Sequence, residues 1–258
     1  MSPETDAASS HRAVRSQPAW AVIVGLLGEL LIIAGVVLGL YVVWQLFYTD
    51  IEANATQQEV VESLDWVAPI DAGSDGGVTI IPDSLKFGLD SAVSMEEPGL
   101  AETFATMYVP RWGYDYVKPI SQGVTRTDVL DTLGIGHYPG TGMPGALGNF
   151  AISAHRTTYG KPFNKIADLK QGDALVIETK DAWYVYRVTE WEIVQPTQVE
   201  VLAPVPNQPD AAPDDRYITL TTCHPMYSAA KRWITYGELE YWAPHDAGVP
   251  AEIVEDAS

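Results

Sequence analysis

Residues 183–189 read WYVYRVT, and this stretch shows the dominant structural pattern of the chain. Its aromatic and β-branched residues alternate as they do along a half-buried β-strand. Comparable runs bounded by turn residues predict seven strands, at 104–110, 114–120, 149–154, 174–180, 183–194, 217–223 and 233–242. Two short helices are predicted between them, at 125–133 and 162–169. So many strands with so little helix indicate a mainly β fold, a closed or nearly closed β-barrel.

The composition is that of a globular protein and argues against a nucleic-acid partner. The chain has 258 residues, with 15 Lys and Arg against 34 Asp and Glu and a net charge of −19. Phosphate binding needs clustered basic side chains, and these are sparse here. The single cysteine, Cys223, excludes an intramolecular disulfide and any zinc site with two or more thiolates.

A long apolar segment precedes the predicted strands. Residues 19–44 read AWAVIVGLLGELLIIAGVVLGLYVVW and contain one charged residue, Glu29. About 20 apolar residues span a bilayer core, and a signal-peptide core is usually about 7–15 residues, so we expect an uncleaved transmembrane anchor at 19–47. Arg12 and Arg15 precede it and acidic residues follow. The positive-inside rule therefore predicts a single-pass protein of the cell membrane, with a cytoplasmic N-terminus and an extracellular domain.

These features divide the chain into five parts. Scattered Gly, Pro, Asp and Ser residues over 67–103 favour a linker with at most a short strand at 78–81. We expect a cytoplasmic tail at 1–18, the anchor at 19–47, a juxtamembrane stalk and linker at 48–103, the folded β-domain at 104–243 and an acidic C-terminal tail at 244–258.

Three polar side chains lie at the ends of predicted strands. Cys223 ends one strand, and Arg232 opens the next, so a hairpin of this length should bring them close together. His155 directly follows another strand. A thiol and an imidazole can act as nucleophile and general acid or base, and a guanidinium can stabilise an oxyanion. The pattern predicts a candidate site formed by Cys223, His155 and Arg232.

Each of these residues also has a simpler explanation. A lone cysteine is commonly a small buried hydrophobic residue, and a single His or Arg is commonly structural. His224 adjoins Cys223, but successive strand residues point to opposite faces, so we expect His224 to be a poor base for the thiol. A zinc site formed by Cys223, His137, His155 and His224 also stays open, although no HExxH or CxxC spacing supports it.

Several motifs, taken together, resemble those of sortases, the cell-surface transpeptidases of Gram-positive bacteria. Residues 219–223 read TLTTC and precede Arg232, like the TLxTC…R signature, and HRTTYGKPF at 155–163 resembles the HRxxxGxxF motif. LKQGD at 169–173 is similar to a further family motif, and GHYPGT at 136–141 with PGALGN at 144–149 resembles class E sortases. The resemblance covers about residues 104–242. One departure is Ala154, where the family commonly has Gly.

The resemblance implies an eight-stranded sortase-type β-barrel with short helices, preceded by one N-terminal transmembrane helix, and no metal or organic cofactor. It implies that Cys223 attacks the Thr–Gly bond of a C-terminal LAXTG or LPXTG sorting signal. His155 would protonate the leaving amine, and Arg232 would hold the oxyanion and the substrate backbone.

The implied partners are secreted proteins that bear the sorting signal, an amine of a cell-wall peptidoglycan precursor, and the membrane through residues 19–47. Tyr138 and Thr222 are the substrate-binding candidates, with Tyr138 expected to read the Ala or Pro of the signal. The loops at 195–216 and 224–231 are expected to wall the substrate groove.

Two other functions stay open. A pilin-polymerising sortase would use a protein lysine as acceptor and often carries an Asp-Pro-aromatic lid, for which residues 64–66 (LDW) are the nearest match and lack the proline. A non-catalytic surface assembly module would keep the sortase barrel without its thiol chemistry.

Overall fold

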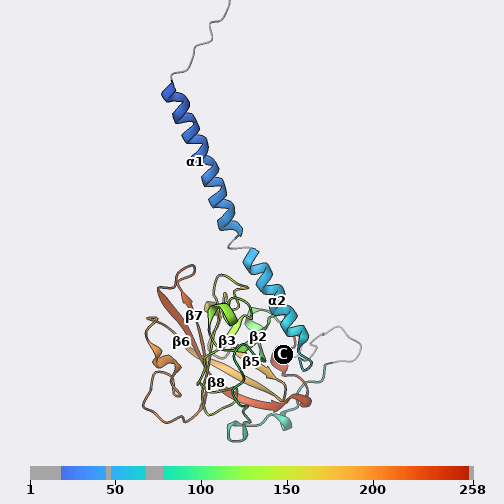
Figure 1. The fold of residues 1–258 in the computed structure, drawn as a ribbon. Helices are drawn as coiled ribbons and strands as arrows, with labels where there is room; N and C mark the ends of the chain where they lie inside the picture. The colour runs from blue at the N-terminus through green and yellow to red at the C-terminus, as the bar shows by residue number, and fades with distance from the viewer. Residues whose placement is uncertain (1–18, 45–47, 68–77, 256–258) are drawn as a thin grey trace, which may run out of the picture. The chain divides into compact units, whose positions relative to one another are not determined.

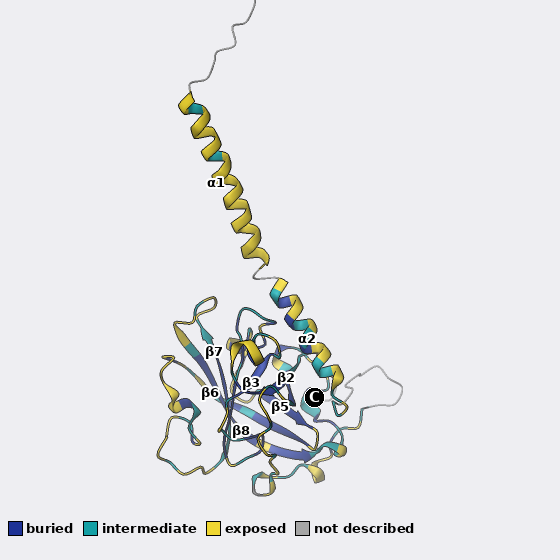
Figure 2. Cartoon of the chain, viewed as in Figure 1, coloured by how far each residue is buried: buried dark blue, intermediate teal, exposed yellow. Residues whose placement is uncertain are grey.

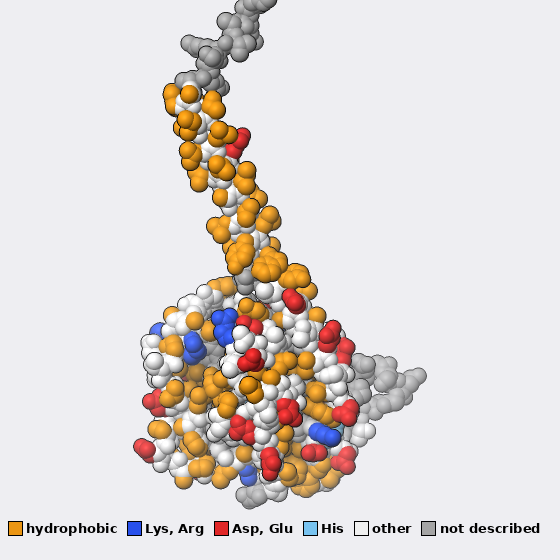
Figure 3. Space-filling model, viewed as in Figure 1, with side chains coloured by type: hydrophobic (Ala, Val, Ile, Leu, Met, Phe, Trp, Pro, Cys, Tyr) orange, Lys and Arg blue, Asp and Glu red, His pale blue; other side chains and the backbone are white. Residues whose placement is uncertain are grey.

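The computed structural model describes residues 19–44, 48–67 and 78–255, which fall into two units. The described part of the first unit is helix α1 (Ala19–Val43), 25 residues in which none is buried. Apolar side chains cover the helix, and it is long and apolar enough to cross a membrane (Figures 2 and 3). The helix therefore fits the predicted anchor. The predicted tail at 1–18 and residues 45–47 lie outside the described residues.

The second unit is built around a closed β-barrel of eight strands (Figure 1). The strands are β1 (Thr103–Tyr108), β2 (Val117–Gln122), β3 (Ile135–His137), β4 (Gly148–Ser153), β5 (Ala174–Thr179), β6 (Ala182–Val194), β7 (Arg216–His224) and β8 (Lys231–Pro244). Around the barrel they follow the order β1-β2-β3-β4-β7-β8-β6-β5. β2 pairs with β3 and β4 with β7 in parallel, and the other neighbours are antiparallel. The eight-stranded barrel implied by the resemblance is confirmed.

The predicted elements match the observed ones unevenly. Seven strands were predicted and seven lie within a few residues of those positions, but β3 was missed because its three residues are too short to show alternation. Of the predicted helices, 125–133 forms one π-helical turn at Arg126–Leu130, and 162–169 forms a short 3₁₀ turn at Ile166–Asp168.

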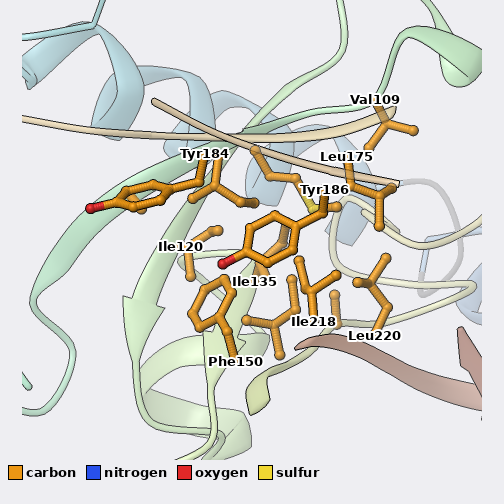
Figure 4. Close-up of a cluster of buried hydrophobic side chains, with 14 of the residues drawn as sticks. Val109, Ile120, Ile135, Phe150, Leu175, Tyr184, Tyr186, Ile218 and Leu220 are labelled. Carbon is orange, nitrogen blue, oxygen red and sulfur yellow. The ribbon is translucent and has the colours of Figure 1, made fainter. Parts of the chain in front are cut away.

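The barrel interior is filled by large apolar side chains from most of its strands (Figure 4). Ile120, Ile135, Phe150, Tyr186 and Ile218 belong to this cluster and are at most 1% exposed. They come from β2, β3, β4, β6 and β7, so the strands that carry the candidate site residues are held by one core. Close packing of this kind fixes the strand positions, because shifting one side chain would disturb its neighbours.

The segments flanking the barrel pack against it, which differs from the linker and the acidic tail that the sequence predicted. Ile81 is 2% exposed, and the backbone of Phe87 pairs with Trp242 of β8. Val249 and Ile253 are buried in the same cluster as Ile81, against residues of β5, β6 and β8 that point away from the barrel interior. The outer face of these strands is apolar, and the flanking segments shield it from water. Composition alone missed this, because a few apolar residues are scattered among many polar ones.

Helix α2 (Thr49–Ser63) lies against β2, within the segment predicted to be a stalk (Figure 1). Its buried residues, Asp50, Ala53 and Gln57, have the i, i+3, i+7 spacing of one helical face. Lys118 of β2 donates hydrogen bonds to Asn54 Oδ1 at 2.6 Å and to Gln57 Oε1 at 2.8 Å. Residues 49–63 are thus part of the folded unit.

The lysine beneath α2 predicts how stability changes with pH. Burial lowers the pKa of Lys118 from 10.5 to about 8, with the Asp50 carboxylate opposing the shift. Between these two pH values the unfolded chain binds more protons than the folded chain, so the contribution of Lys118 to the free energy of unfolding rises with pH. Below about pH 8 the full cost of burying the ammonium is present.

We therefore expect the thermal midpoint of the wild type to rise relative to that of Lys118→Gln between about pH 7.5 and about pH 9.5. Tryptophan fluorescence of the full chain in detergent measures both midpoints. Lys170→Gln, at an exposed position, serves as the control and should follow the wild type. Parallel pH curves for wild type and Lys118→Gln would contradict the assignment.

Candidate active site

The hairpin of β7 and β8 places Cys223 opposite Arg232. The two residues are direct partners in the antiparallel register of these strands. Cys223 is half-buried, and it is a free thiol. The proximity predicted from the nine-residue spacing therefore arises from strand pairing.

His155 reaches the same edge through the parallel pairing of β4 with β7. Ser153 of β4 aligns with Thr221 of β7, so both strands finish side by side. Two hydrogen bonds extend the pairing by one residue: Ala154 N donates to Thr221 O at 3.3 Å, and Thr222 Oγ1 donates to Ala154 O at 2.7 Å. His155 directly follows Ala154 in the sequence, and Cys223 directly follows Thr222.

A cleft of about 240 Å³ opens at this edge of the barrel. Its lining includes the three catalytic candidates and the two substrate-binding candidates: Cys223, His155, Arg232, Tyr138 and Thr222. The remaining walls come from residues 124–130 and from the end of β4. The loops at 195–216 and 224–231, which were expected to wall the substrate groove, do not line this cleft. Residues 195–216 pack on the barrel, where Asn149 Nδ2 donates to the carbonyls of Val201 and Ala203.

The imidazole of His155 is held on two sides. Its Nε2 lies 2.6 Å from Asp131 Oδ1, and the ring packs against Tyr159 with centroids 5.2 Å apart. Arg126 also faces Asp131, with its Nε 3.5 Å from Oδ1. With the carboxylate at Nε2, this nitrogen carries the proton, and Nδ1 is the ring nitrogen left for proton transfer. Sequence reasoning missed Asp131, because it lies in a segment without a motif and meets His155 only through the fold.

Arg232 holds its guanidinium against its own hairpin. Its Nη1 donates to the carbonyls of Ala229 and Lys231, each at 3.0 Å. Within the described residues no carboxylate forms a salt bridge with Arg232. The guanidinium therefore keeps donors that can serve an anionic or carbonyl oxygen in the cleft.

A second arginine, Arg156, supports the site from behind. Its Nη1 donates to Cys223 O at 3.3 Å and to His224 Nδ1 at 3.0 Å, and its guanidinium lies over the Trp233 ring. Burial, followed by the charges of Arg156 and Lys231, lowers the pKa of His224. His224 is thus a neutral acceptor for Arg156, and it does not line the cleft.

Tyr138 and Thr222 line the cleft with their hydroxyl groups already bonded within the protein. Tyr138 Oη lies 3.0 Å from Thr221 Oγ1. Thr222 is buried, and its hydroxyl donates to the Ala154 carbonyl, so its proton is used to join β7 to the end of β4. Both residues are placed at the cleft, and Thr222 has a structural contact that the sequence did not indicate.

The hydrogen bonds of His137 involve neither the thiol nor another histidine. It is fully buried, with Nδ1 at 2.7 Å from Gln122 Oε1 and Nε2 at 3.0 Å from Gly142 O. Burial lowers the pKa of His137. Among the residues the structure describes, no three His, Cys, Asp or Glu side chains are grouped to hold a metal ion. The zinc alternative therefore has no ligand set in the described chain.

Comparison with known proteins gives one consistent family. The sortase domain model matches residues 107–240. Sortase SrtE1 of Streptomyces coelicolor is 33% identical over 253 residues; the match covers 95% of this chain and 66% of the relative, just under two thirds of its length. The SrtA sortase structure from Actinomyces oris is 44% identical with a TM-score of 0.61, covering 66% of this chain and 97% of that one. Sortase E1 from S. coelicolor, solved with a tripeptide in the active site, is 37% identical with a TM-score of 0.55. That match covers 60% of this chain and 98% of the other chain.

The hydrogen bond between Thr222 and Ala154 yields a prediction about strand pairing. Thr222→Val keeps the shape but leaves a buried carbonyl without its donor, so we expect the free energy of unfolding to fall by about 1–3 kcal/mol. Thr222→Ser keeps the hydroxyl and should retain most of the stability. Urea unfolding of the three proteins measures the difference. Equal stability of wild type and Thr222→Val would show that the hydroxyl does not join the strands.

Proposed function

The chain belongs to the sortase family of cysteine transpeptidases, and from this premise we propose that it cleaves a C-terminal LAXTG or LPXTG sorting signal between Thr and Gly. It then transfers the protein to an amine of a cell-wall precursor. The observation that carries the proposal is the meeting of Cys223, His155 and Arg232 at one cleft. The tripeptide in the active site of the S. coelicolor enzyme supports a peptide substrate.

In the first step, the proton of the Cys223 thiol passes to Nδ1 of His155, and the thiolate attacks the threonine carbonyl carbon. A sulfur–carbon bond forms, and the carbonyl oxygen takes the negative charge, which Arg232 stabilises by donating hydrogen bonds. As the carbon–nitrogen bond to glycine breaks, His155 gives its proton to the leaving amine. The product of this step is a thioester between Cys223 and the sorted protein.

In the second step, the acceptor amine attacks the thioester. His155, now neutral, takes a proton from the incoming amine, and Cys223 leaves as a thiolate. The imidazolium then returns its proton to the thiolate, which restores the thiol and the neutral imidazole with which the first step began. Asp131 acts as a positioning residue in both steps, because its bond to Nε2 directs Nδ1 of His155 to the proton transfers.

The ring of Tyr138 is our candidate for reading the second residue of the signal. It lines the cleft, and Thr221 holds its hydroxyl, so the ring has a fixed position. We assign Thr222 to the cleft wall next to the thiol. Residues 64–66 do not line the cleft, so no observation favours the lid of a pilin-polymerising enzyme.

For localisation, we propose that α1 is a single-pass anchor with the N-terminus in the cytoplasm and the barrel outside the cell. Length and apolar composition of the helix support the anchor. The basic residues before it and the acidic residues after it support the orientation.

The reaction is tested with the full chain, LAXTG and LPXTG peptides, and triglycine as acceptor. We expect Cys223→Ala to abolish both cleavage and transfer. Arg232→Lys should lose most activity, because lysine keeps the charge but not the planar fork that holds two oxygens. His224→Ala, outside the cleft, is the control and should retain substantial activity. Mass spectrometry follows the products, and turnover by Cys223→Ala would refute the proposed function.

Selectivity for the signal is tested separately at Tyr138. A pocket contact to Ala or Pro is worth about 1–3 kcal/mol, or about 10–200-fold in kcat/KM. If the tyrosine hydroxyl fixes the ring for the Ala form, Tyr138→Phe should reduce kcat/KM for LAXTG more than for LPXTG. Equal losses for the two peptides would give Tyr138 a structural role alone.

A further inference from the structure

Helix α2 buries polar side chains on the face that meets the barrel. Asp50 is 7% exposed and Gln57 1%, and with Ala53 they follow the i, i+3, i+7 spacing of one helical face. Burying a carboxylate and an amide is costly unless both are hydrogen-bonded. Their hydrogen-bond partners therefore identify the segments that this face of the helix contacts.

Apart from Lys118 of β2, which donates to Gln57 Oε1, these partners are consecutive residues of the loop that follows His155. Asp50 Oδ1 accepts a hydrogen bond from Gly160 N at 3.1 Å, and Asp50 Oδ2 pairs with Lys161 Nζ at 2.9 Å. Gln57 Nε2 donates to Tyr159 O at 3.1 Å. Each of the three loop residues thus forms one hydrogen bond or ion pair with the helix.

The loop needs such support, because its backbone is strained. Tyr159, Gly160 and Lys161 all have positive φ angles, at 54°, 77° and 39°. Tyr and Lys rarely adopt this region, and such residues persist only where surrounding contacts fix them. The helix supplies contacts from outside the cleft at each of these positions.

Gln57 also joins this loop to the segment that carries Asp131. A Cβ atom on Gly160 would meet the Gln57 amide at 2.9 Å, and one on Gly134 would meet Gln57 Cδ at 3.0 Å. The amide therefore fits between two glycines, one in each loop. These loops supply the two groups that hold the His155 imidazole, Tyr159 at its face and Asp131 at Nε2.

We propose that helix α2 is a positioning element for His155, acting through Gln57 and Asp50 on the loops that carry Tyr159 and Asp131. The segment between the membrane anchor and the barrel is then required for catalysis and is more than a spacer. This inference rests on the proposed sortase function for its kinetic consequences, while its structural claim concerns the imidazole alone.

The chain offers a matched pair of variants for the test. Gln57 and Gln58 are adjacent in α2, but Gln57 is buried between the loops, whereas Gln58 is exposed and bonded to Glu62. Gln57→Ala should lower kcat for LAXTG cleavage by about 10- to 100-fold, with KM within about twofold, because a displaced proton donor slows chemistry more than binding. Gln58→Ala should match the wild type. Asp131→Asn, which removes the direct charge at Nε2, should share the kcat loss.

Kinetics are measured with the full chain in lipid nanodiscs, well below the thermal midpoint of each variant. A second readout uses the ring ¹⁵N signals of ¹⁵N-histidine-labelled protein, with the His155 signals assigned by His155→Gln. Gln57→Ala should shift the tautomer signals of His155, and Gln58→Ala should not. If Gln57→Ala does not fold, Asp50→Asn provides the same comparison through loss of the Lys161 ion pair.

Wild-type kcat and unchanged His155 signals in a folded Gln57→Ala or Asp50→Asn protein would overturn the inference. A lower thermal midpoint with normal kcat would also overturn it, since α2 would then contribute only stability. If the wild type itself shows no cleavage, the proposed function fails, and the ¹⁵N signals of Gln57→Ala against Gln58→Ala still decide the positioning role.

Discussion

In the barrel, β4 and β7 run side by side in the same direction, and the arrangement of the cleft follows from that pairing. The register joins Ser153 to Thr221, so the two chains leave one edge together as His155 and Cys223. β8 then returns antiparallel and sets Arg232 opposite the thiol. A slip of one residue in either pairing would turn these side chains to the other face of the sheet. Register is thus the constraint that brings together a thiol, an imidazole and a guanidinium.

Two arginines beside one hairpin have different surroundings and therefore different roles. Arg156 is buried, and it bonds the Cys223 carbonyl and the His224 ring from behind the strand. Arg232 is half-exposed at the cleft and bonds only carbonyls of its own hairpin among the described residues. The guanidinium of Arg156 bonds within the scaffold, and that of Arg232 keeps donors that face the cleft. The same residue type thus has two environments beside one hairpin, which differ in burial.

Polar contacts from outside the cleft complete the site. Asp131 and Tyr159 hold the imidazole, and α2 bonds the loop that carries Tyr159 and packs through Gln57 against Gly134 in the segment that carries Asp131. These contacts join residues far apart in sequence: Asp50 meets Gly160, and Gln57 meets Tyr159. The helix that follows α1 in the sequence is therefore part of the folded unit, and its buried face meets β2 and the loop after His155.

Short-range patterns in the sequence determined the long apolar helix α1, seven of the strands and the thiol, imidazole and guanidinium that line the cleft, because apolar patterning and motif spacing are local properties. The tertiary structure alone decided β3, the packing of residues 78–103 and 244–255, and the contacts of Asp131 and α2 with the histidine environment. A three-residue strand has no period to detect. Asp131 and Gln57 have no local signal either, since their partners lie 24 and 102 residues away along the chain, and only closure of the barrel brings them together.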